Sequence, residues 1–194
     1  MKTLQRFGLG FIAAAWLLLG CMQLLTALRL RTLLPALLAA ESILVGYRLL
    51  SRRPDSDNPN PWYVRSGILA TVFLAPLLLR IENPVPLAGT VVACLGVSLT
   101  LWALWTLGAS FGITPADRGL VTRGPYKYIR HPMYAGALLN TLPAVIWNPS
   151  PWNLALLAII VVIDIIRIHL EERTIFAYDQ YAARVRWRII PFVW

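Results

Sequence analysis

The chain has 194 residues, of which 58% are hydrophobic and 14% are charged. Soluble domains carry about 25% charged residues, so this composition, with a mean hydropathy of +0.62, argues against a soluble domain and predicts a membrane protein. The net charge is +9. Its basic residues fall in short runs between apolar stretches, which indicates contact with anionic lipid headgroups and argues against nucleic acid as a partner.

The cysteines offer no metal or redox chemistry. Cys21 and Cys94 both lie inside apolar segments, without a CxxC pattern or a neighbouring histidine. Neither a zinc site nor a disulfide pair is expected from such isolated cysteines, and the sequence predicts no metal. The apolar stretch after Lys2 and Arg6 is too long for a signal peptide and lacks an A-x-A site, so we expect it to be retained as the first span.

The apolar segments predict an all-α, polytopic integral membrane bundle of five to six helices. Crossing the hydrocarbon core takes roughly 20 residues of apolar helix. The last two apolar helices are expected to form a hairpin, of which the first leg is short enough to be tilted or re-entrant. A polar segment, 171–188, is expected to form an interfacial helix. The expected apolar helices are 7–28, 32–50, 66–79, 85–108, 133–147 and 152–168.

The basic residues predict how the bundle is oriented. With six crossings, 15 of the 18 Lys and Arg residues fall on one face, and only Arg29, Arg31 and Arg80 fall on the other. An excess of Lys and Arg marks the cytoplasmic side. Both termini and the polar segment 109–130 are therefore expected to be cytoplasmic. We divide the chain into N-terminal transmembrane helices, 1–108, and a C-terminal part that carries the chemistry, 109–194.

A first polar cluster follows the fourth apolar segment. Residues 120–136 read Leu-Val-Thr-Arg-Gly-Pro-Tyr-Lys-Tyr-Ile-Arg-His-Pro-Met-Tyr-Ala-Gly. Gly124 and Pro125 predict a turn, and Pro132 suits the first turn of a helix. Arg130 and His131 are thus expected at a helix N-terminus on the membrane surface, where carboxylates bind well. A basic, aromatic interfacial anchor is the alternative interpretation.

A second polar cluster ends the last apolar segment. Asp164, Arg167 and Glu171 lie three and four residues apart, so they share one helical face, and Glu172 and Arg173 follow directly. Ionisable groups at the end of a span are costly and are candidate functional residues, although an interfacial ladder of ion pairs is also possible. Glu41 is an isolated acid in the second span, with Arg48 as its only nearby basic residue.

Together these clusters resemble the isoprenylcysteine carboxyl methyltransferase family and the related phospholipid methyltransferases. The resemblance covers about the last ninety residues, and the earlier part is similar only as apolar spans. The motifs that carry it are Leu120-Val121, Gly124-Pro125-Tyr126, Arg130-His131-Pro132, Tyr134 and Gly136, then Glu171-Glu172-Arg173 after an apolar hairpin, and finally Tyr181, Arg184-Val185 and Pro191-Phe192.

The resemblance implies S-adenosyl-L-methionine as cofactor and a prenylated or other lipid-like acceptor that enters from the bilayer. It places the acceptor-facing arginine at Arg167, with Glu171 and Arg173 as further catalytic candidates. Cofactor contacts are implied for Arg118, Gly119, Leu120, Val121, Tyr126, Arg130, His131, Pro132, Met133, Tyr134 and Glu171.

The function expected from this resemblance is carboxyl O-methylation of a C-terminal isoprenylcysteine. A carboxylate acceptor is ionised at neutral pH and needs no general base, so the protein has only to position it and exclude water. Three alternatives stay open. The first is a phospholipid N-methyltransferase, which needs a general base for its amine acceptor. The others are an NADPH-dependent sterol-type reductase, since those enzymes have a similar Arg-His-Pro-x-Tyr segment, and a non-catalytic membrane scaffold.

Overall fold

A computed structural model describes residues 2–53, 68–69, 72 and 78–194, with side chains from residue 8 onward. Within those residues every regular element is helical, which confirms the all-α prediction. The predicted helix 66–79 lies largely outside the described residues. The α-helices are α1 (Lys2–Leu30), α2 (Leu33–Ser51), α4 (Leu87–Leu107), α5 (Pro132–Trp147), α6 (Pro151–Thr174) and α7 (Tyr178–Arg184), with the short 3₁₀ helices η1 (Gly108–Ser110) and η2 (Gly124–Lys127).

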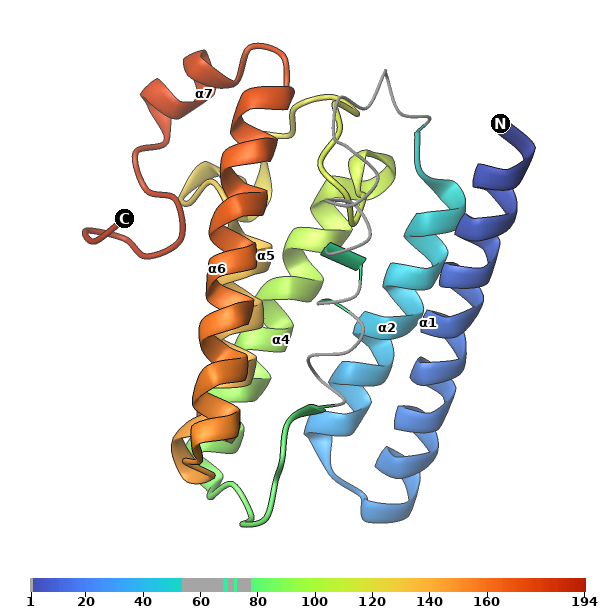
Figure 1. Ribbon diagram of the computed structural model, residues 1–194, viewed down its shortest axis with the longest axis vertical. Helices are drawn as coiled ribbons and strands as arrows, with labels where there is room; N and C mark the ends of the chain where they lie inside the picture. The colour runs from blue at the N-terminus through green and yellow to red at the C-terminus, as the bar shows by residue number, and fades with distance from the viewer. Residues whose placement is uncertain (1, 54–67, 70–71, 73–77) are drawn as a thin grey trace.

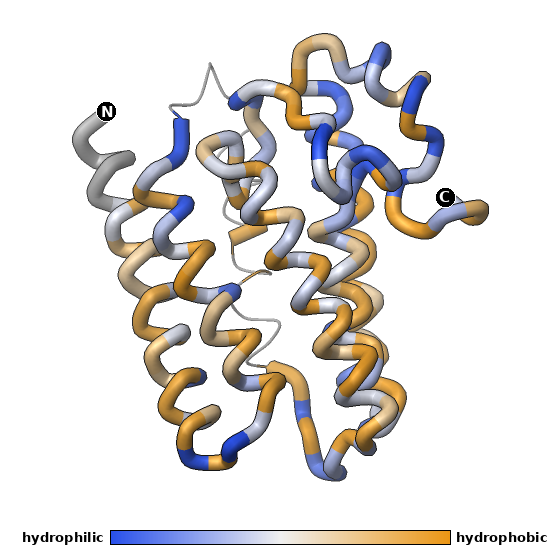
Figure 2. The backbone as a smooth tube through the Cα atoms, turned by 180° about the vertical axis from the view of Figure 1, so that it is seen from behind, coloured by the Kyte–Doolittle hydropathy of each residue, from blue (hydrophilic) through white to orange (hydrophobic). Residues whose placement is uncertain are grey.

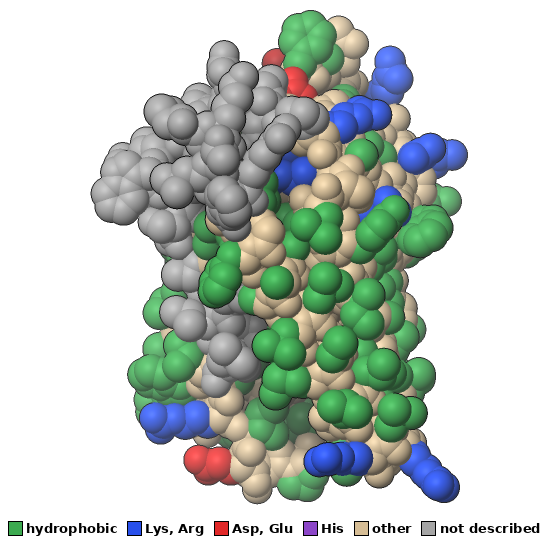
Figure 3. Space-filling view, turned by 90° about the vertical axis from the view of Figure 1, so that its right-hand side faces the viewer, with side chains coloured by type: hydrophobic (Ala, Val, Ile, Leu, Met, Phe, Trp, Pro, Cys, Tyr) green, Lys and Arg blue, Asp and Glu red, His purple; other side chains and the backbone are tan. Residues whose placement is uncertain are grey.

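Among the described residues, four helical segments are long and apolar enough to cross a membrane: Gly8–Leu30, Leu33–Ser51, Leu87–Ser110 and Pro151–Thr174. Figure 3 shows apolar side chains over the middle of the molecule and Lys and Arg side chains near both ends. Helix α5 has only 16 residues, as the short predicted segment 133–147 indicated. Helix α6 runs six residues beyond the predicted 152–168, because its last turns include the polar cluster at Glu171 and Glu172.

The polar segments of the C-terminal half gather at one end of the bundle (Figure 1). The N-terminus, the end of α2, the loop between α4 and α5, and the segment around α7 all lie toward this end. The tube view shows hydrophilic stretches concentrated there (Figure 2). The backbone N–H of Arg53 donates to the carbonyl of Ala109 at 2.8 Å, which joins α2 to the loop after α4. We call this end the polar end; its cytoplasmic location stays a prediction.

The opposite end is closed by two asparagines, Asn148 just after α5 and Asn153 in the first turn of α6. The Asn148 side-chain oxygen accepts from the backbone N–H groups of Glu82 and Asn83 at 2.8 and 2.6 Å. Asn153 exchanges two hydrogen bonds with the backbone of Arg80, at 3.1 and 2.8 Å. These bonds satisfy backbone groups of an irregular segment that has no helical partners of its own. The hairpin of α5 and α6 is thereby attached to the chain entering α4.

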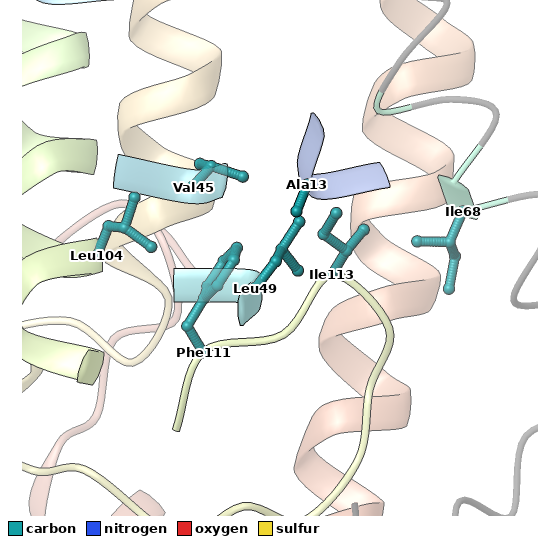
Figure 4. Packing of buried hydrophobic residues seen from close by; sticks show 7 residues of the cluster. All are labelled: Ala13, Val45, Leu49, Ile68, Leu104, Phe111 and Ile113. Carbon is teal, nitrogen blue, oxygen red and sulfur yellow. The ribbon is translucent and has the colours of Figure 1, made fainter. Parts of the chain in front are cut away.

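The loop after α4 folds back into the bundle instead of running over its surface. Phe111 and Ile113 are buried in the same apolar cluster as Val45, Leu49 and Leu104 (Figure 4). Burying such side chains stabilises the fold by about 1.5–3 kcal/mol each. The insertion fixes the residues that follow, 114–121, across the polar end of the helices.

Helices α4 and α5 approach closely through small residues. A Cβ atom built on Gly96 would lie 2.6 Å from both the backbone nitrogen of Asn140 and the carbonyl oxygen of Gly136. Gly136 in turn faces the Thr100 hydroxyl and the Gly96 carbonyl. Small residues at such crossings let backbones pack where lipid offers no hydrophobic driving force between helices. This contact sets the direction in which α5 leaves the polar end.

We predict that Gly96→Ala destabilises the protein by about 1–3 kcal/mol, because the new methyl group meets backbone atoms that cannot move aside. Gly10→Ala is the matched control, since nothing lies within 4 Å of the added Cβ and alanine favours helix. Thermal unfolding in detergent measures both variants. Equal unfolding temperatures for the two would contradict the close packing of α4 on α5.

Candidate functional site

A cavity of about 790 Å³ runs between the helices from the polar end into the apolar interior. Ligand cavities typically measure about 300–1,000 Å³, so its volume suits an organic molecule. At the polar end the wall carries charged and aromatic side chains from α5, α6 and the loop 111–131. The rest of the wall is lined by apolar side chains of several helices and of the segment before α4, among them Trp16, Leu38, Val85 and Ile160. The charged groups at the polar end therefore come from 109–194, while α1 and α2 contribute mainly apolar side chains to the rest of the wall.

The Glu172 carboxylate joins three segments at the polar end. It accepts hydrogen bonds from Arg130 Nη1 at 3.0 Å, from Arg188 Nη2 at 2.9 Å and from Arg188 Nε at 3.0 Å. Beside these ion pairs, the backbone N–H groups of Arg130 and His131 donate to the carbonyls of Trp187 and Arg188, each at 2.8 Å. Arginine forks hold carboxylates with defined geometry. The C-terminal segment is thus fixed against the start of α5.

His131 lies between the two carboxylates at the end of α6. Its Nε2 is 3.3 Å from Glu172 Oε1 and 3.0 Å from the Tyr178 hydroxyl, and its Nδ1 is 3.6 Å from Glu171 Oε2. Burial alone lowers the pKa of His131, but the hydrogen bonds and charges of Glu171 and Glu172 outweigh burial and raise it above the ordinary value of 6.5. With a carboxylate at each ring nitrogen, the protonated imidazole is the favoured form.

Glu171 and Arg167 form the inner part of the polar wall. The Tyr134 hydroxyl donates to Glu171 Oε1 at 2.5 Å, and the Arg167 guanidinium lies 4.7 Å from the centre of the Tyr134 ring. Arg167 also donates to Asp164 Oδ1 at 3.3 Å and to the Ile113 carbonyl at 3.2 Å. Its Nε–H is buried and, within the described structure, has no hydrogen-bond partner. An unsatisfied buried donor of this kind costs about 1–3 kcal/mol.

Arg118 enters the wall from the loop between α4 and α5. It is only 6% exposed and lies flat against Gly112, where any Cβ would collide with its guanidinium. Its Nη1 donates to the Thr114 carbonyl at 3.3 Å, while its own carbonyl accepts from the Ser110 hydroxyl at 3.0 Å. Gly119 follows with a φ of +93°, a conformation that favours glycine. Gly112 leaves room for the guanidinium and Gly119 allows the turn after it, so that the buried Arg118 side chain lines the cavity.

Three tyrosines form the aromatic part of the polar end. The Tyr181 hydroxyl donates to the Tyr126 carbonyl at 2.7 Å, and the Tyr178 and Tyr181 rings meet edge to face at 5.5 Å. Burial raises the pKa of Tyr126, Tyr178 and Tyr181 above the ordinary value of 10.0, so all three hydroxyls are neutral at physiological pH. They offer flat apolar faces together with hydrogen-bonding hydroxyls.

The structure places most of the predicted site residues on one cavity wall. Arg173 is exposed on α6 and does not line the cavity, and Pro132 is buried in the first turn of α5 without lining it. Arg130 lines the cavity, but its guanidinium is engaged by Glu172. The predicted residues that do line it are Arg118, Gly119, Leu120, Val121, Tyr126, Arg130, His131, Met133, Tyr134, Arg167 and Glu171.

Two residues of this site did not follow from the sequence pattern. Tyr178 bonds His131, and Arg188 bonds Glu172; both lie in the segment 171–188, which was expected to form an interfacial helix and for which no site residue beyond 173 was predicted. The available signal was the adjacent pair Glu171-Glu172, because two buried carboxylates require basic or hydroxyl partners. Arg188 is one of the nearest basic residues along the chain that could supply one.

The raised pKa of His131 predicts a pH-dependent stability. Its contribution is fully present below about pH 6.5 and is lost as the pH rises through the folded-state pKa, because only the protonated ring is held by both carboxylates. We expect the stability difference between wild type and His131→Gln to be largest near pH 6 and to shrink toward about pH 9. Unfolding temperatures across this range measure it. A difference that grows with pH would contradict the proposed charge state.

Comparison with known proteins agrees with this arrangement. The family model of phospholipid methyltransferases matches residues 84–183, just over half of the chain, and the match includes α4, α5, α6 and the loop that carries Arg118 and Arg130. No curated protein matches the chain. The match covers the segments from which most of the cavity's polar wall is built, and the chain belongs to the phospholipid methyltransferase family, which is related to the isoprenylcysteine carboxyl methyltransferases.

Proposed function

We propose that the protein transfers a methyl group from S-adenosylmethionine to the carboxylate of a lipid-like acceptor, with a C-terminal prenylated cysteine as the leading acceptor class. Family membership supports membrane methyl transfer and argues against the reductase and scaffold alternatives. The observation that carries the choice of a carboxylate is Arg167, whose buried Nε–H has no partner among the described residues and whose side chain lines the cavity.

The polar wall suits the groups of S-adenosylmethionine. Glu171 can bind its ammonium group or ribose hydroxyls, and Arg118 can bind its carboxylate, while His131 holds Glu171 in place. The faces of Tyr126 and Tyr181 suit an adenine ring or a sulfonium, since aromatic faces attract both. When bound, this cofactor supplies a methyl group activated by the positive sulfur. Every one of these side chains lines the same cavity, so the residues fit the cofactor.

Arg167 would hold the acceptor. The Asp164 carboxylate and the Ile113 carbonyl fix the guanidinium plane, and the Tyr134 ring supports one side of it. A carboxylate that accepts from this guanidinium would be held at a defined angle, because the donors of a guanidinium lie in one plane. The acceptor carboxylate is already ionised, so no side chain has to remove a proton.

The apolar part of the cavity would hold the acceptor's tail and exclude water. Positioning two reactants in this way can lower the barrier by about 7–11 kcal/mol without chemical participation of the protein. The cavity is continuous from Arg167 to the apolar residues of α1 and α2. A head at the polar end and a tail among the helices is the arrangement that such a shape favours.

We predict that Glu171→Gln weakens S-adenosylmethionine binding by roughly tenfold to a hundredfold, as expected for loss of a charged hydrogen-bond acceptor. Glu82→Gln is the matched control, because Glu82 is exposed at the opposite end of the bundle. Calorimetry on detergent-solubilised protein measures the affinities. If the wild-type protein binds no S-adenosylmethionine, the methyl-transfer proposal is wrong in its present form.

We predict that Arg167→Lys keeps the fold and the cofactor affinity but lowers methyl transfer about a hundredfold or more, because an ammonium lacks the planar fork. Arg123→Lys on the exposed loop is the control and should leave the rate unchanged. Single-turnover transfer of labelled methyl measures the effect. A near wild-type rate for Arg167→Lys would remove Arg167 from the acceptor site and direct the search to Arg118 and Arg130, the other arginines that line the cavity.

Phospholipid N-methylation is the second candidate. Asp164 and Glu171 both line the cavity beside Arg167, and either carboxylate could take the proton that an ammonium acceptor must lose. The purified protein should be offered a prenylated cysteine, a phosphatidylethanolamine and a sterol with labelled cofactor. Transfer to the phosphatidylethanolamine alone, at a rate that rises with pH, would establish the amine acceptor instead.

A further inference from the structure

Glu41 is an acidic side chain deep inside the bundle, away from the polar end. It is the ninth of the 19 residues of α2, is half-buried, and lines the cavity. Ten residues separate it from Ser51 at the polar end of α2, which corresponds to about 15 Å of helix. Arg167 lies seven residues, or about 10 Å, from the corresponding end of α6. Glu41 is therefore set among the apolar residues that face an acceptor's tail.

No described residue neutralises Glu41 or hydrogen-bonds to it. Arg48, its nearest basic residue along α2, instead places its guanidinium over the rings of Tyr47 and Trp105, at 5.5 and 5.3 Å. The neighbouring Ser42 hydroxyl donates to Gln23 Oε1 at 2.8 Å. A carboxyl group without a partner inside a membrane bundle is expensive, and such groups mark binding sites or pathways.

A second polar side chain of the cavity wall is hydrogen-bonded to Ser42, the residue that follows Glu41. This is Gln23 of α1, and the bond from Ser42 occupies only its side-chain oxygen. Its amide N–H groups have no partner in the described part of the chain, so they remain available as donors. Gln23 and Glu41 together thus offer a hydrogen-bond donor and a hydrogen-bond acceptor. We call these two residues the deep pair.

A plain hydrocarbon tail would leave the deep pair without hydrogen bonds. It would cover the Glu41 carboxyl and the Gln23 amide and displace water from them, and it forms no hydrogen bonds to replace those of the water. A hydroxyl group, in contrast, both donates and accepts a hydrogen bond. It could donate to Glu41 and accept from Gln23 at once.

We infer that the deep pair is a subsite for a hydroxyl group carried on the tail of the acceptor. This inference rests on the proposed function only in assuming that a lipid-like acceptor occupies the cavity. It narrows the acceptor class to lipids with a hydroxylated tail and a head that reaches Arg167. Such an acceptor is bound both at its head and along its tail, so the deep pair favours it over lipids whose tails carry no hydroxyl group.

Binding of fatty acids tests the inference without methyl transfer. The probes are a long-chain saturated fatty acid and its monohydroxy derivatives, each with the hydroxyl at a different tail carbon. We expect one derivative to bind the wild-type protein about tenfold more tightly than the parent, as for one well-placed hydrogen bond. Glu41→Leu should abolish this preference and strengthen binding of the parent. Ala40→Leu, which adds the same side chain at an exposed position of α2, should keep the preference.

The outcomes separate the subsite from the reaction. Equal affinities for the parent and every derivative in the wild-type protein would overturn the subsite and show that water hydrates the deep pair. Absence of binding by all probes would overturn it as well. If Glu41→Leu does not fold, Gln23→Leu and Glu41→Gln, which should each reduce the preference, replace it. A preserved preference in a protein that transfers no methyl group would leave the subsite standing and refute the proposed function.

Discussion

The Glu172 carboxylate determines how the polar end of the molecule is assembled. It receives hydrogen bonds from Arg130, which precedes α5, and from Arg188, which follows α7, while it is itself part of α6. One buried carboxylate between two arginines is costly to desolvate and is stable only when its hydrogen bonds are complete. The hydrogen bonds to Glu172 hold the end of α6 in place. The preceding residue, Glu171, therefore faces the cavity, and His131 lies between the two carboxylates.

The sequence was sufficient for the helices and for most of the site because both depend on local patterns. Apolar length predicted the spans, and helical spacing placed Asp164, Arg167 and Glu171 on one face, as the structure has them on one cavity wall. Contacts between distant segments could not be derived in this way. The inserted loop at Phe111 and the pairing of Arg130 with Glu172 depend on which helices are neighbours, and spacing along one chain does not encode that.

The ion pair between Asp164 and Arg167 has two physical consequences. It is the contact that a purely structural arginine would make, since the partners lie three residues apart on one helix. The guanidinium of Arg167 is also fixed by the Ile113 carbonyl and the Tyr134 ring. A side chain that is already fixed loses less conformational entropy when a ligand binds. The pair therefore does not distinguish the two roles. A buried Nε–H without a partner among the described residues does not do so alone, because Arg48 and Arg130 share it; Arg167 combines it with a place on the cavity wall beside Asp164 and Glu171.

The cavity combines two environments that favour different parts of one molecule. Near Glu171 the wall is dense in charge. Farther along it is mostly apolar, with polar side chains at Gln23, Glu41, Ser42, Thr100, Asn140 and Thr141. A small polar ligand would leave the apolar part wet, and a plain lipid would leave the charged part without partners. A molecule with a charged head and a long tail satisfies both parts at once, and binding energy gained along the tail can then orient the head for reaction. The bilayer supplies such molecules directly, which is a physical reason for placing this chemistry inside a membrane bundle.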